Sequence, residues 1–147
     1  MTQQSKPLKK PISVLVVLHD GKGNILLLER ADRAGFWQSV TGSIESGECL
    51  SETALREVWE ETGIRLSHND LNDWHEHTVY EIYPHWRHRY PAGTTHNTEH
   101  FFSAIIPQNS TIKLTEHTAY QWLDMAAAAK LVFSPSNRSA ILNLAQH

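Results

Sequence analysis

The sequence predicts a mixed α/β (α+β) fold, because strand-like segments dominate and the few helical segments are spread irregularly among them. Aliphatic and β-branched side chains gather in short runs, most clearly over 12–18. Helical periodicity is confined to 50–61 and to the C-terminal part of the chain. Strands and helices that do not alternate regularly argue against a doubly wound parallel sheet, so we expect a sandwich of helices and a mixed sheet.

The first half of the chain predicts three strands and a turn. Residues 12–18 are rich in β-branched side chains and are expected to form a buried strand. The sequence Asp20-Gly21-Lys22-Gly23 favours a turn, after which 24–29 returns as a second strand. A short strand is expected over 36–41, immediately before Gly42.

The helix expected over 50–61 is the clearest element. Gly63 follows its last turn and suits the left-handed conformation that commonly ends a helix. Further strands are expected over 78–83, 100–106 and 119–123. Helices are expected over 124–132 and 136–145, with Pro135 near the start of the second.

Length and composition exclude several classes of protein. With 147 residues and 16.8 kDa, we expect one domain over 1–147. A net charge of −3 offers no polycation for nucleic acid, and the single Cys49 excludes an internal disulfide or a cysteine-based zinc site. The sequence has no apolar run that could span a membrane, and its first residues lack the apolar core of a signal peptide. We therefore expect a cytoplasmic protein without membrane or nucleic-acid partners.

The position of the charges is more informative than their sum. Residues 45–61 contain six glutamates and one arginine, a net charge of −5, whereas the rest of the chain carries +2. Glu57 and Glu61 are four residues apart on one helix face, with Glu60 beside them. Such like-charged pairs repel by roughly 0.2–0.5 kcal/mol, and the negative end of the helix dipole adds to the cost. A solvated acidic face is one interpretation. A divalent cation with oxygen ligands, Mg²⁺ or Mn²⁺, is the alternative that removes the repulsion.

The spacing around these glutamates matches a known motif. Gly42, five residues, Glu48, seven residues, and then Arg56-Glu57-Val58-Trp59-Glu60-Glu61-Thr62-Gly63-Ile64 resemble the Nudix box throughout. Seven fixed identities at this spacing would arise by chance with a probability on the order of 10⁻⁹ per start position. The resemblance implies an α/β/α sandwich around a mixed sheet. It also implies a loop–helix–loop motif that binds Mg²⁺ and a pyrophosphate group.

The same resemblance implies roles for the residues of the box. Glu57 and Glu61 would be direct metal ligands, and Glu60 would be a ligand or would position a water molecule. Arg56 would orient the glutamates, and Glu48 would hold the loop to the helix. Glu116, outside the box, would complete the metal site or act as the base, so the general base remains open among Glu60, Glu61 and Glu116. The expected catalytic residues are Arg56, Glu60, Glu61 and Glu116, and the expected metal ligands are Glu57, Glu61 and Glu116.

Segments outside the box resemble one bacterial group of Nudix hydrolases, which acts on dihydroneopterin triphosphate in folate biosynthesis. These segments are 36–43, 85–91, 97–99, 115–117, 120–123 and 136–138. The resemblance implies hydrolysis of this pterin triphosphate to dihydroneopterin monophosphate and pyrophosphate. The same chemistry leaves two other substrates open, namely damaged nucleoside triphosphates and dinucleoside polyphosphates. A module that senses nucleotides without cleaving them is a third hypothesis, although here every position of the box is filled.

Candidate substrate-binding residues follow from their chemistry. Arg30 and Lys9 could hold phosphate oxygens, and aromatic faces at Tyr80 and Tyr83 could stack on a pterin ring. The alternatives are a solvated terminal lysine and tyrosines that pack in the core. The complete set of expected substrate-binding residues is Lys9, Arg30, Thr41, Tyr80, Glu81, Ile82, Tyr83 and Ser136.

Eight of the ten histidines lie between His68 and His117. The pairs 75/77, 85/88 and 96/100 have spacings compatible with zinc, but no partner fixes a four-ligand set, so solvated histidines are the expected outcome. The basic and aromatic segment 85–90 has too few cations to bind a nucleic-acid backbone. The five tryptophans are expected, on average, to serve packing and not to form a cofactor site.

Overall fold

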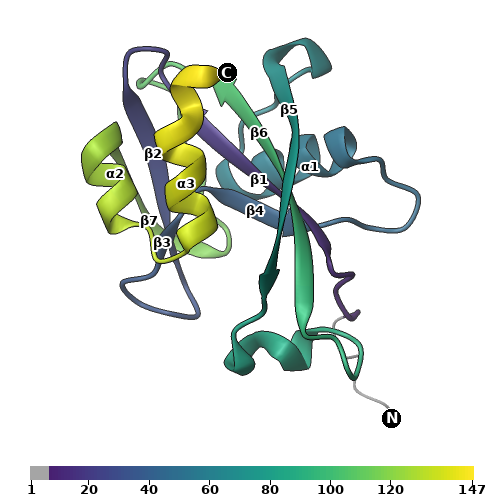
Figure 1. The fold of residues 1–147 in the computed structure, drawn as a ribbon. Coiled ribbons are helices and arrows are strands. Elements are labelled where there is room, and N and C mark those ends of the chain that lie inside the picture. Colours follow the sequence, from purple (N-terminus) through teal and green to yellow (C-terminus); the bar gives the residue numbers. More distant parts are fainter. Residues whose placement is uncertain (1–6) are drawn as a thin grey trace.

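The computed structural model describes residues 7–147 and shows a mixed sheet between helices (Figure 1). Within this range the sheet has seven strands. The strands are β1 (Ile12–His19), β2 (Asn24–Arg30), β3 (Trp37–Gln38), β4 (Val40–Ser43), β5 (Leu71–Glu81), β6 (His96–Ile105) and β7 (His117–Asp124). The helices are α1 (Leu50–Thr62), α2 (Met125–Leu131) and α3 (Pro135–Asn143), with short 3-10 turns η1 (His68–Asp70), η2 (Pro84–Arg89) and η3 (Leu144–Gln146).

Strand β1 is the centre of the sheet. Along its whole length it pairs in parallel with β6, and β5 continues the sheet antiparallel to β6. On its other side β1 meets β2 at one residue pair only, His19 with Ile25, whereas residues 13–16 pair with β4. Strands β3 and β7 both pair with β2. The N-terminal half of β1 therefore lies between β4 and β6.

The alternation of side chains along β1 divides the interior into two cores. Val14, Val16 and Leu18 are fully buried against the side of the sheet that carries α1. Leu15 and Val17 point the other way, into a core shared with α2 and α3. Because successive strand residues face opposite sides, the five consecutive apolar residues 14–18, all buried, indicate a strand covered on both faces. The predicted α/β/α sandwich is confirmed.

Helix α1 follows its local sequence closely. Glu52 accepts a hydrogen bond from the backbone N–H of Cys49 at 2.9 Å, which caps the first turn. Gly63 has the predicted left-handed conformation, with φ of 74°, and its N–H donates to the carbonyl of Trp59 at 2.8 Å.

Three predicted strands have different bounds in the structure. The strand expected over 36–41 divides at Ser39 into β3 and β4, so Gly42 lies inside β4. Strand β6 begins at His96 instead of at residue 100, and β5 begins at Leu71 instead of at residue 78. Residues 71–77 are mostly polar, and they are extended because they pair with β6 across a bulge between Asp73 and His77. Pairing with a distant strand leaves no local sequence pattern.

The helices were also compared with the length needed to cross a bilayer. Within residues 7–147, no helix combines sufficient length with an apolar composition that would allow it to span a membrane.

Candidate active site

The three glutamates of the box lie in the last turns of α1, next to β4. Glu61 is buried with 3 % of its surface exposed, Glu57 is half-buried, and about half of the Glu60 side chain is exposed. Gly42 of β4 lies directly against Glu57, and a Cβ atom at this position would overlap the Glu57 carboxyl group. The glycine of the motif thus allows the helix carboxylate to approach the strand.

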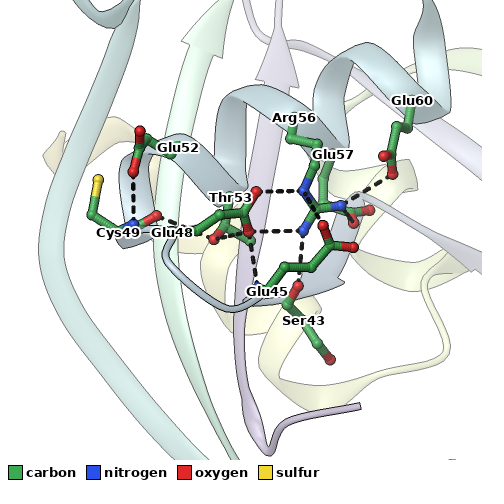
Figure 2. A network of polar contacts seen from close by, with 9 residues as sticks. All are labelled: Ser43, Glu45, Glu48, Cys49, Glu52, Thr53, Arg56, Glu57 and Glu60. Carbon is green, nitrogen blue, oxygen red and sulfur yellow. Dashed lines mark hydrogen bonds and ion pairs between the residues drawn. The ribbon is translucent and has the colours of Figure 1, made fainter. Parts of the chain in front are cut away.

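Arg56 is the centre of the network that holds these carboxylates (Figure 2). Its Nε donates to Glu48 at 2.6 Å, and its Nη1 donates to Glu57 at 2.6 Å and to Glu60 at 3.1 Å. Its Nη2 donates to Glu48 and to the carbonyl of Ser43, both at 3.0 Å. Arg56 therefore connects the loop, the end of β4 and two glutamates of α1, and its role in orienting the glutamates stays a prediction.

Glu48 fixes the loop before α1. Besides Arg56, it accepts hydrogen bonds from Thr53 Oγ1 and from the backbone N–H of Glu45, both at 2.9 Å. These contacts, with Arg56 first, lower the pKa of Glu48 to about 2, so its carboxylate stays ionised. The pKa of Arg56 is raised for the same reason, mainly by Glu48.

Among these glutamates, Glu61 has the least favourable environment for an ionised carboxylate. Burial, followed by the adjacent Glu57 and then Glu116, raises its pKa well above the usual range, and the backbone N–H of Thr41 opposes this rise. Its Oε1 atom is buried without a hydrogen-bond partner, and the Nε2 of His117 lies 3.6 Å from it. A carboxyl oxygen that is both buried and unpartnered lacks the compensation that such groups normally have.

These glutamates fit a hard divalent cation. Their donor atoms are oxygens, the orphaned Glu61 Oε1 lies next to Glu57, and a cation would offset the repulsion between the two carboxylates. Within residues 7–147, no group of three or more His, Cys, Asp or Glu side chains is placed so that it could hold a metal ion by itself. Mg²⁺ suits this incomplete set, because it commonly takes one or two carboxylates and keeps waters and phosphate oxygens as its other ligands.

Glu116 reaches the site from another element. It lies exposed in the loop before β7, where its carbonyl accepts from the backbone N–H of Ala31 at 3.3 Å. Its negative charge contributes to the raised pKa of Glu61 and partly opposes the lowering of the pKa of Lys9. Glu116 is therefore close enough to interact electrostatically with both residues. The structure therefore brings Glu116 near the box glutamates without placing it in their hydrogen-bond network.

A pocket of about 240 Å³ adjoins the glutamates through Gly42. It lies on the face of the sheet that α3 covers further along, and the N-terminal residues of α3 form one side of it. All the predicted substrate-binding residues line it, namely Lys9, Arg30, Thr41, Tyr80, Glu81, Ile82, Tyr83 and Ser136. These residues come from five separate parts of the chain, so the fold assembles a single cavity from dispersed positions.

Cations gather where the pocket meets the glutamates. Lys9 is half-buried, and its backbone N–H donates to the carbonyl of Arg89 at 2.8 Å. Burial, then the charges of Arg89 and Arg30, lowers the pKa of Lys9 to about 8. Arg30 is held in place by Asp32 through two hydrogen bonds of 2.7 Å and by Gln38 at 3.2 Å. Lys9 is thus not a solvated terminal lysine.

Aromatic rings form the outer wall of the pocket. Tyr83 stacks on Trp86 with ring centroids 5.6 Å apart, and the Arg30 guanidinium lies over the Trp86 ring at 4.4 Å. Phe133, in the link between α2 and α3, contacts both rings. Tyr80 is half-buried and lies at the floor instead, where its hydroxyl accepts from Asn97 at 3.0 Å.

Two predicted residues contribute to this wall in less direct ways. Ile82 is buried, and its carbonyl accepts from Arg87 Nε at 2.9 Å. The largely exposed Glu81 side chain forms an ion pair with Arg87 at 2.8 Å. Their backbone shapes the pocket, whereas the Glu81 carboxylate is directed to a partner on η2.

Several lining residues were not predicted individually. Trp86 and Arg89 lie in the 3-10 turn η2, and Phe133 lies between α2 and α3. Neither segment has a periodic sequence pattern. Asn97 and Glu99 are buried on β6 with 1 % and 4 % of their surfaces exposed. The sequence signal that could have indicated them is their alternation: Asn97 and Glu99 lie two residues apart on β6, at positions of one strand face where apolar residues are expected.

The other predictions for histidine and tryptophan can be compared directly. The rings of His77 and His100 lie 5.3 Å apart across β5 and β6, but no histidine cluster in residues 7–147 is arranged as a metal site. Trp74 packs in the core, as predicted. Trp59 does not: it is 46 % exposed beneath the Arg65 guanidinium, and Trp86 lines the pocket, so the packing prediction is wrong for these two.

Comparison with known proteins was made on both sequence and structure. A family model described as NUDIX domain matches residues 9–144. The chain is 46 % identical over 142 residues to "Dihydroneopterin triphosphate diphosphatase" of Escherichia coli (strain K12), covering 94 % of each chain. It is 40 % identical to the protein of the same name from Haemophilus influenzae, covering 88 % of this chain and 84 % of that one. The solved structure of the E. coli dihydroneopterin triphosphate pyrophosphohydrolase superimposes with a TM-score of 0.87 and 46 % identity over 92 % of this chain and 95 % of that one.

Proposed function

The chain belongs to the NUDIX family, and from this premise we propose that it hydrolyses dihydroneopterin triphosphate to dihydroneopterin monophosphate and pyrophosphate. The observation that carries the proposal is the continuity of two features at Gly42. On one side lie the box glutamates, and on the other lies a pocket with cations near the glutamates and aromatic rings at its wall. A triphosphate attached to a flat heterocycle has the matching sequence of chemical groups.

We further propose that the cofactor is Mg²⁺, with Mn²⁺ as a substitute. NUDIX hydrolases generally depend on a divalent metal ion. Glu57 and Glu61 would hold the ion, with Glu116 as a third ligand or as the base. When bound, Mg²⁺ neutralises the diphosphate and lowers the pKa of a coordinated water molecule.

The residues of the chain divide the remaining work. Arg56 holds Glu57 and Glu60 in fixed positions. Within residues 7–147 no ion pair involves Lys9 or Arg89, which line the pocket and could bind phosphate oxygens, whereas Arg30 already shares its guanidinium with Asp32. In the reaction, a water oxygen forms a bond to phosphorus as the phosphoanhydride bond breaks, and a carboxylate takes the water proton. Glu60, Glu61 and Glu116 remain candidates for that base.

The decisive experiment compares the hydrolysis of dihydroneopterin triphosphate with that of a panel of substrates, each with and without Mg²⁺. Pyrophosphate release follows dihydroneopterin triphosphate, ATP, GTP and 8-oxo-dGTP, whereas the nucleotide products of diadenosine tetraphosphate are separated by chromatography. We expect the pterin triphosphate to have the largest kcat/KM and activity to require the metal. Equal or better turnover of 8-oxo-dGTP or the dinucleotide would overturn the pterin assignment, and hydrolysis in ¹⁸O-labelled water would identify the phosphorus attacked.

We propose that one NUDIX domain carries the whole activity, in the cytoplasm and without membrane or nucleic-acid partners. A pocket of about 240 Å³ suits a small molecule. The single cysteine, Cys49, is free and exposed, which suits a reducing compartment.

A further inference from the structure

Glu99 is a buried carboxylate that the proposed mechanism does not use. It lies on β6 at the floor of the pocket with 4 % of its surface exposed. Its Oε1 accepts one hydrogen bond, from Ser136 Oγ at 2.7 Å, and no ion pair or other side-chain hydrogen bond involves it within residues 7–147. Burying a carboxylate without a cation is costly unless donors compensate it. The protein supplies one such donor, so the Oε2 atom is left to the pocket.

A second unused acceptor lies beside it. Asn97 is two residues earlier on β6 and therefore faces the same side of the sheet. Its Nδ2 donates to Ser13 Oγ at 2.6 Å and to the Tyr80 hydroxyl at 3.0 Å, whereas its Oδ1 is buried without a partner. The floor of the pocket is therefore rich in hydrogen-bond acceptors and complements a ligand rich in N–H donors.

The position of Glu99 suits the ring and not the phosphates. In the strand register Glu99 pairs with Ser13, and Ser13 pairs with Ser43, the neighbour of Gly42. Two strand spacings of about 4.8 Å separate Glu99 from Ser43, so the backbones are roughly 10 Å apart. A bicyclic ring and a three-carbon linker can span that distance between the floor and the carboxylate cluster.

We propose that Glu99 selects the heterocycle by accepting two N–H hydrogen bonds from a 2-amino-4-oxo-pyrimidine edge, with the Asn97 Oδ1 accepting a further N–H. This inference rests on the proposed function and deepens it. The edge presents its 2-amino group and the neighbouring ring N–H side by side, which matches the two oxygens of a carboxylate. Pterin and guanine share this edge, whereas adenine, hypoxanthine and lumazine lack the donor pair. Burial also raises the pKa of Glu99 to about 7, as expected for a buried carboxylate whose one hydrogen-bond donor is Ser136.

The first test changes the substrate and leaves the protein intact. With the wild-type enzyme and Mg²⁺, we expect kcat/KM for GTP to exceed that for ITP by about tenfold, because ITP lacks only the 2-amino donor, and that for ATP by more. Similar values for the three nucleotides would overturn the proposal, since a carboxylate that contacts this edge must distinguish them.

The second test uses Glu99→Gln, which is nearly isosteric and removes the buried charge. One acceptor is replaced by an N–H₂ group that faces the donors of the ring. We expect kcat/KM for dihydroneopterin triphosphate and for GTP to fall by about a hundredfold, with a change of less than about threefold for ATP. The matched control is Glu76→Gln on β5, whose carboxylate is largely exposed and pairs with His147, and which should leave all substrates unchanged. Retained pterin turnover in Glu99→Gln would refute the assignment.

A binding measurement separates this inference from the proposed function. Metal-free protein is titrated with unphosphorylated pterin and with lumazine, whose 2-oxo group would face the carboxylate, while ring fluorescence is followed. We expect wild type to bind pterin at least about tenfold more tightly than lumazine and Glu99→Gln to lose this preference. Pterin selectivity without hydrolysis of the triphosphate would refute the proposed function and leave the Glu99 assignment standing. Hydrolysis with no pterin preference would do the reverse.

Discussion

Two buried carboxylates of this protein lack partners for different reasons. Glu61 is adjacent to other acids, so a cation that several carboxylates share would relieve its unfavourable position. Glu99 has one hydroxyl donor and no neighbouring acid among the causes of its pKa shift, so neutral N–H donors suffice for it. The residue types are identical, and their surroundings determine which kind of ligand each one accepts.

At this scale the first prediction concerns stability and pH. The pKa of Glu99 is about 7 in the folded protein and near 4.5 when unfolded. The folded state therefore binds more protons between these values, and stability falls as pH rises from about 4.5 to 7. Glu99→Gln has no titrating carboxyl group at this position and does not lose this stability. At pH 8 its free energy of unfolding should therefore exceed that of wild type by on the order of 3 kcal/mol more than at low pH. Urea denaturation at pH 5 and pH 8 measures this, and a pH-independent difference would contradict it.

A second prediction at this scale concerns Lys9. Its pKa of about 8 means that it loses its charge in the range where an ordinary lysine keeps it. If it binds phosphate when protonated, kcat/KM for the triphosphate should decline above about pH 8. Lys9→Arg should remove this decline, since arginine stays charged. The test is to measure kcat/KM as a function of pH for both proteins. If Lys9→Arg shows the same decline above about pH 8 as wild type, the decline belongs to another group.

A third prediction at this scale concerns Gly42. A Cβ atom here would overlap the Glu57 carboxyl group, so Gly42→Ala must displace the end of α1 or the side chain of Glu57. Because small displacements of catalytic groups are costly, we expect kcat to fall by about a hundredfold. Gly47→Ala in the loop after β4 is an informative comparison, since a Cβ there meets nothing within 4 Å although its φ of 85° adds strain. Equal effects in both variants would show that the overlap with Glu57 is not the cause of the loss.

At the scale of the element, α1 shows why local sequence predicts some structures well. Its capping glutamate, the left-handed Gly63 and the spacing of its glutamates all lie within one short stretch. The substrate pocket depends instead on strands far apart in sequence, such as β1, β5 and β6, so its predicted lining residues came from the resemblance and from side-chain chemistry and not from a local pattern. Glu99 was missed because its burial follows from the register with β1 and from Ser136 of α3, and neither is visible around residue 99.

A fourth prediction belongs to α1. Arg56 makes hydrogen bonds to three glutamates and to the carbonyl of Ser43, with 19 % of its side chain exposed. Arg56→Gln would leave the carboxylates of Glu48 and Glu57 uncompensated. We expect the free energy of unfolding of the metal-free protein to fall by about 2 kcal/mol. Chemical denaturation of the variant and of wild type measures this difference. Arg65→Gln on the exposed Trp59 ring is the control and should cost far less. No change in Arg56→Gln would mean that its ion pairs are already solvated.

At the scale of the whole molecule, the net charge of −3 conceals two regions of opposite sign. The acidic stretch ends at Glu61, whereas Lys9, Arg30 and Arg89 line the adjoining pocket. A bound Mg²⁺ would make the acidic region attractive to phosphate. The overall charge therefore gives no indication of the charge of the substrate.

The fifth prediction follows from this separation of charge. A cation that binds only the folded state raises stability by RT ln(1 + [L]/Kd). Addition of Mg²⁺ should therefore raise Tm for wild type. Glu61→Gln should abolish the rise and the hydrolysis, while its Tm without metal equals or exceeds that of wild type because a buried charge is gone. Scanning calorimetry with Mg²⁺ and with Na⁺ at equal ionic strength provides the test. A metal-dependent rise that persists in Glu61→Gln would exclude Glu61 as a ligand.

The divided pairing of β1 has a consequence for the size of the substrate. Because β4 and β6 flank the same half of this strand, Gly42 and Glu99 are both anchored to it, one on each side. The separation between the ring subsite and the reacting phosphorus is then set by hydrogen-bonded strands, which cannot lengthen as loops can. Analogues whose linker is one carbon shorter or longer should still bind at either end but react poorly, and no change in loop sequence should restore them. Selection by length would thus be a property of the sheet itself.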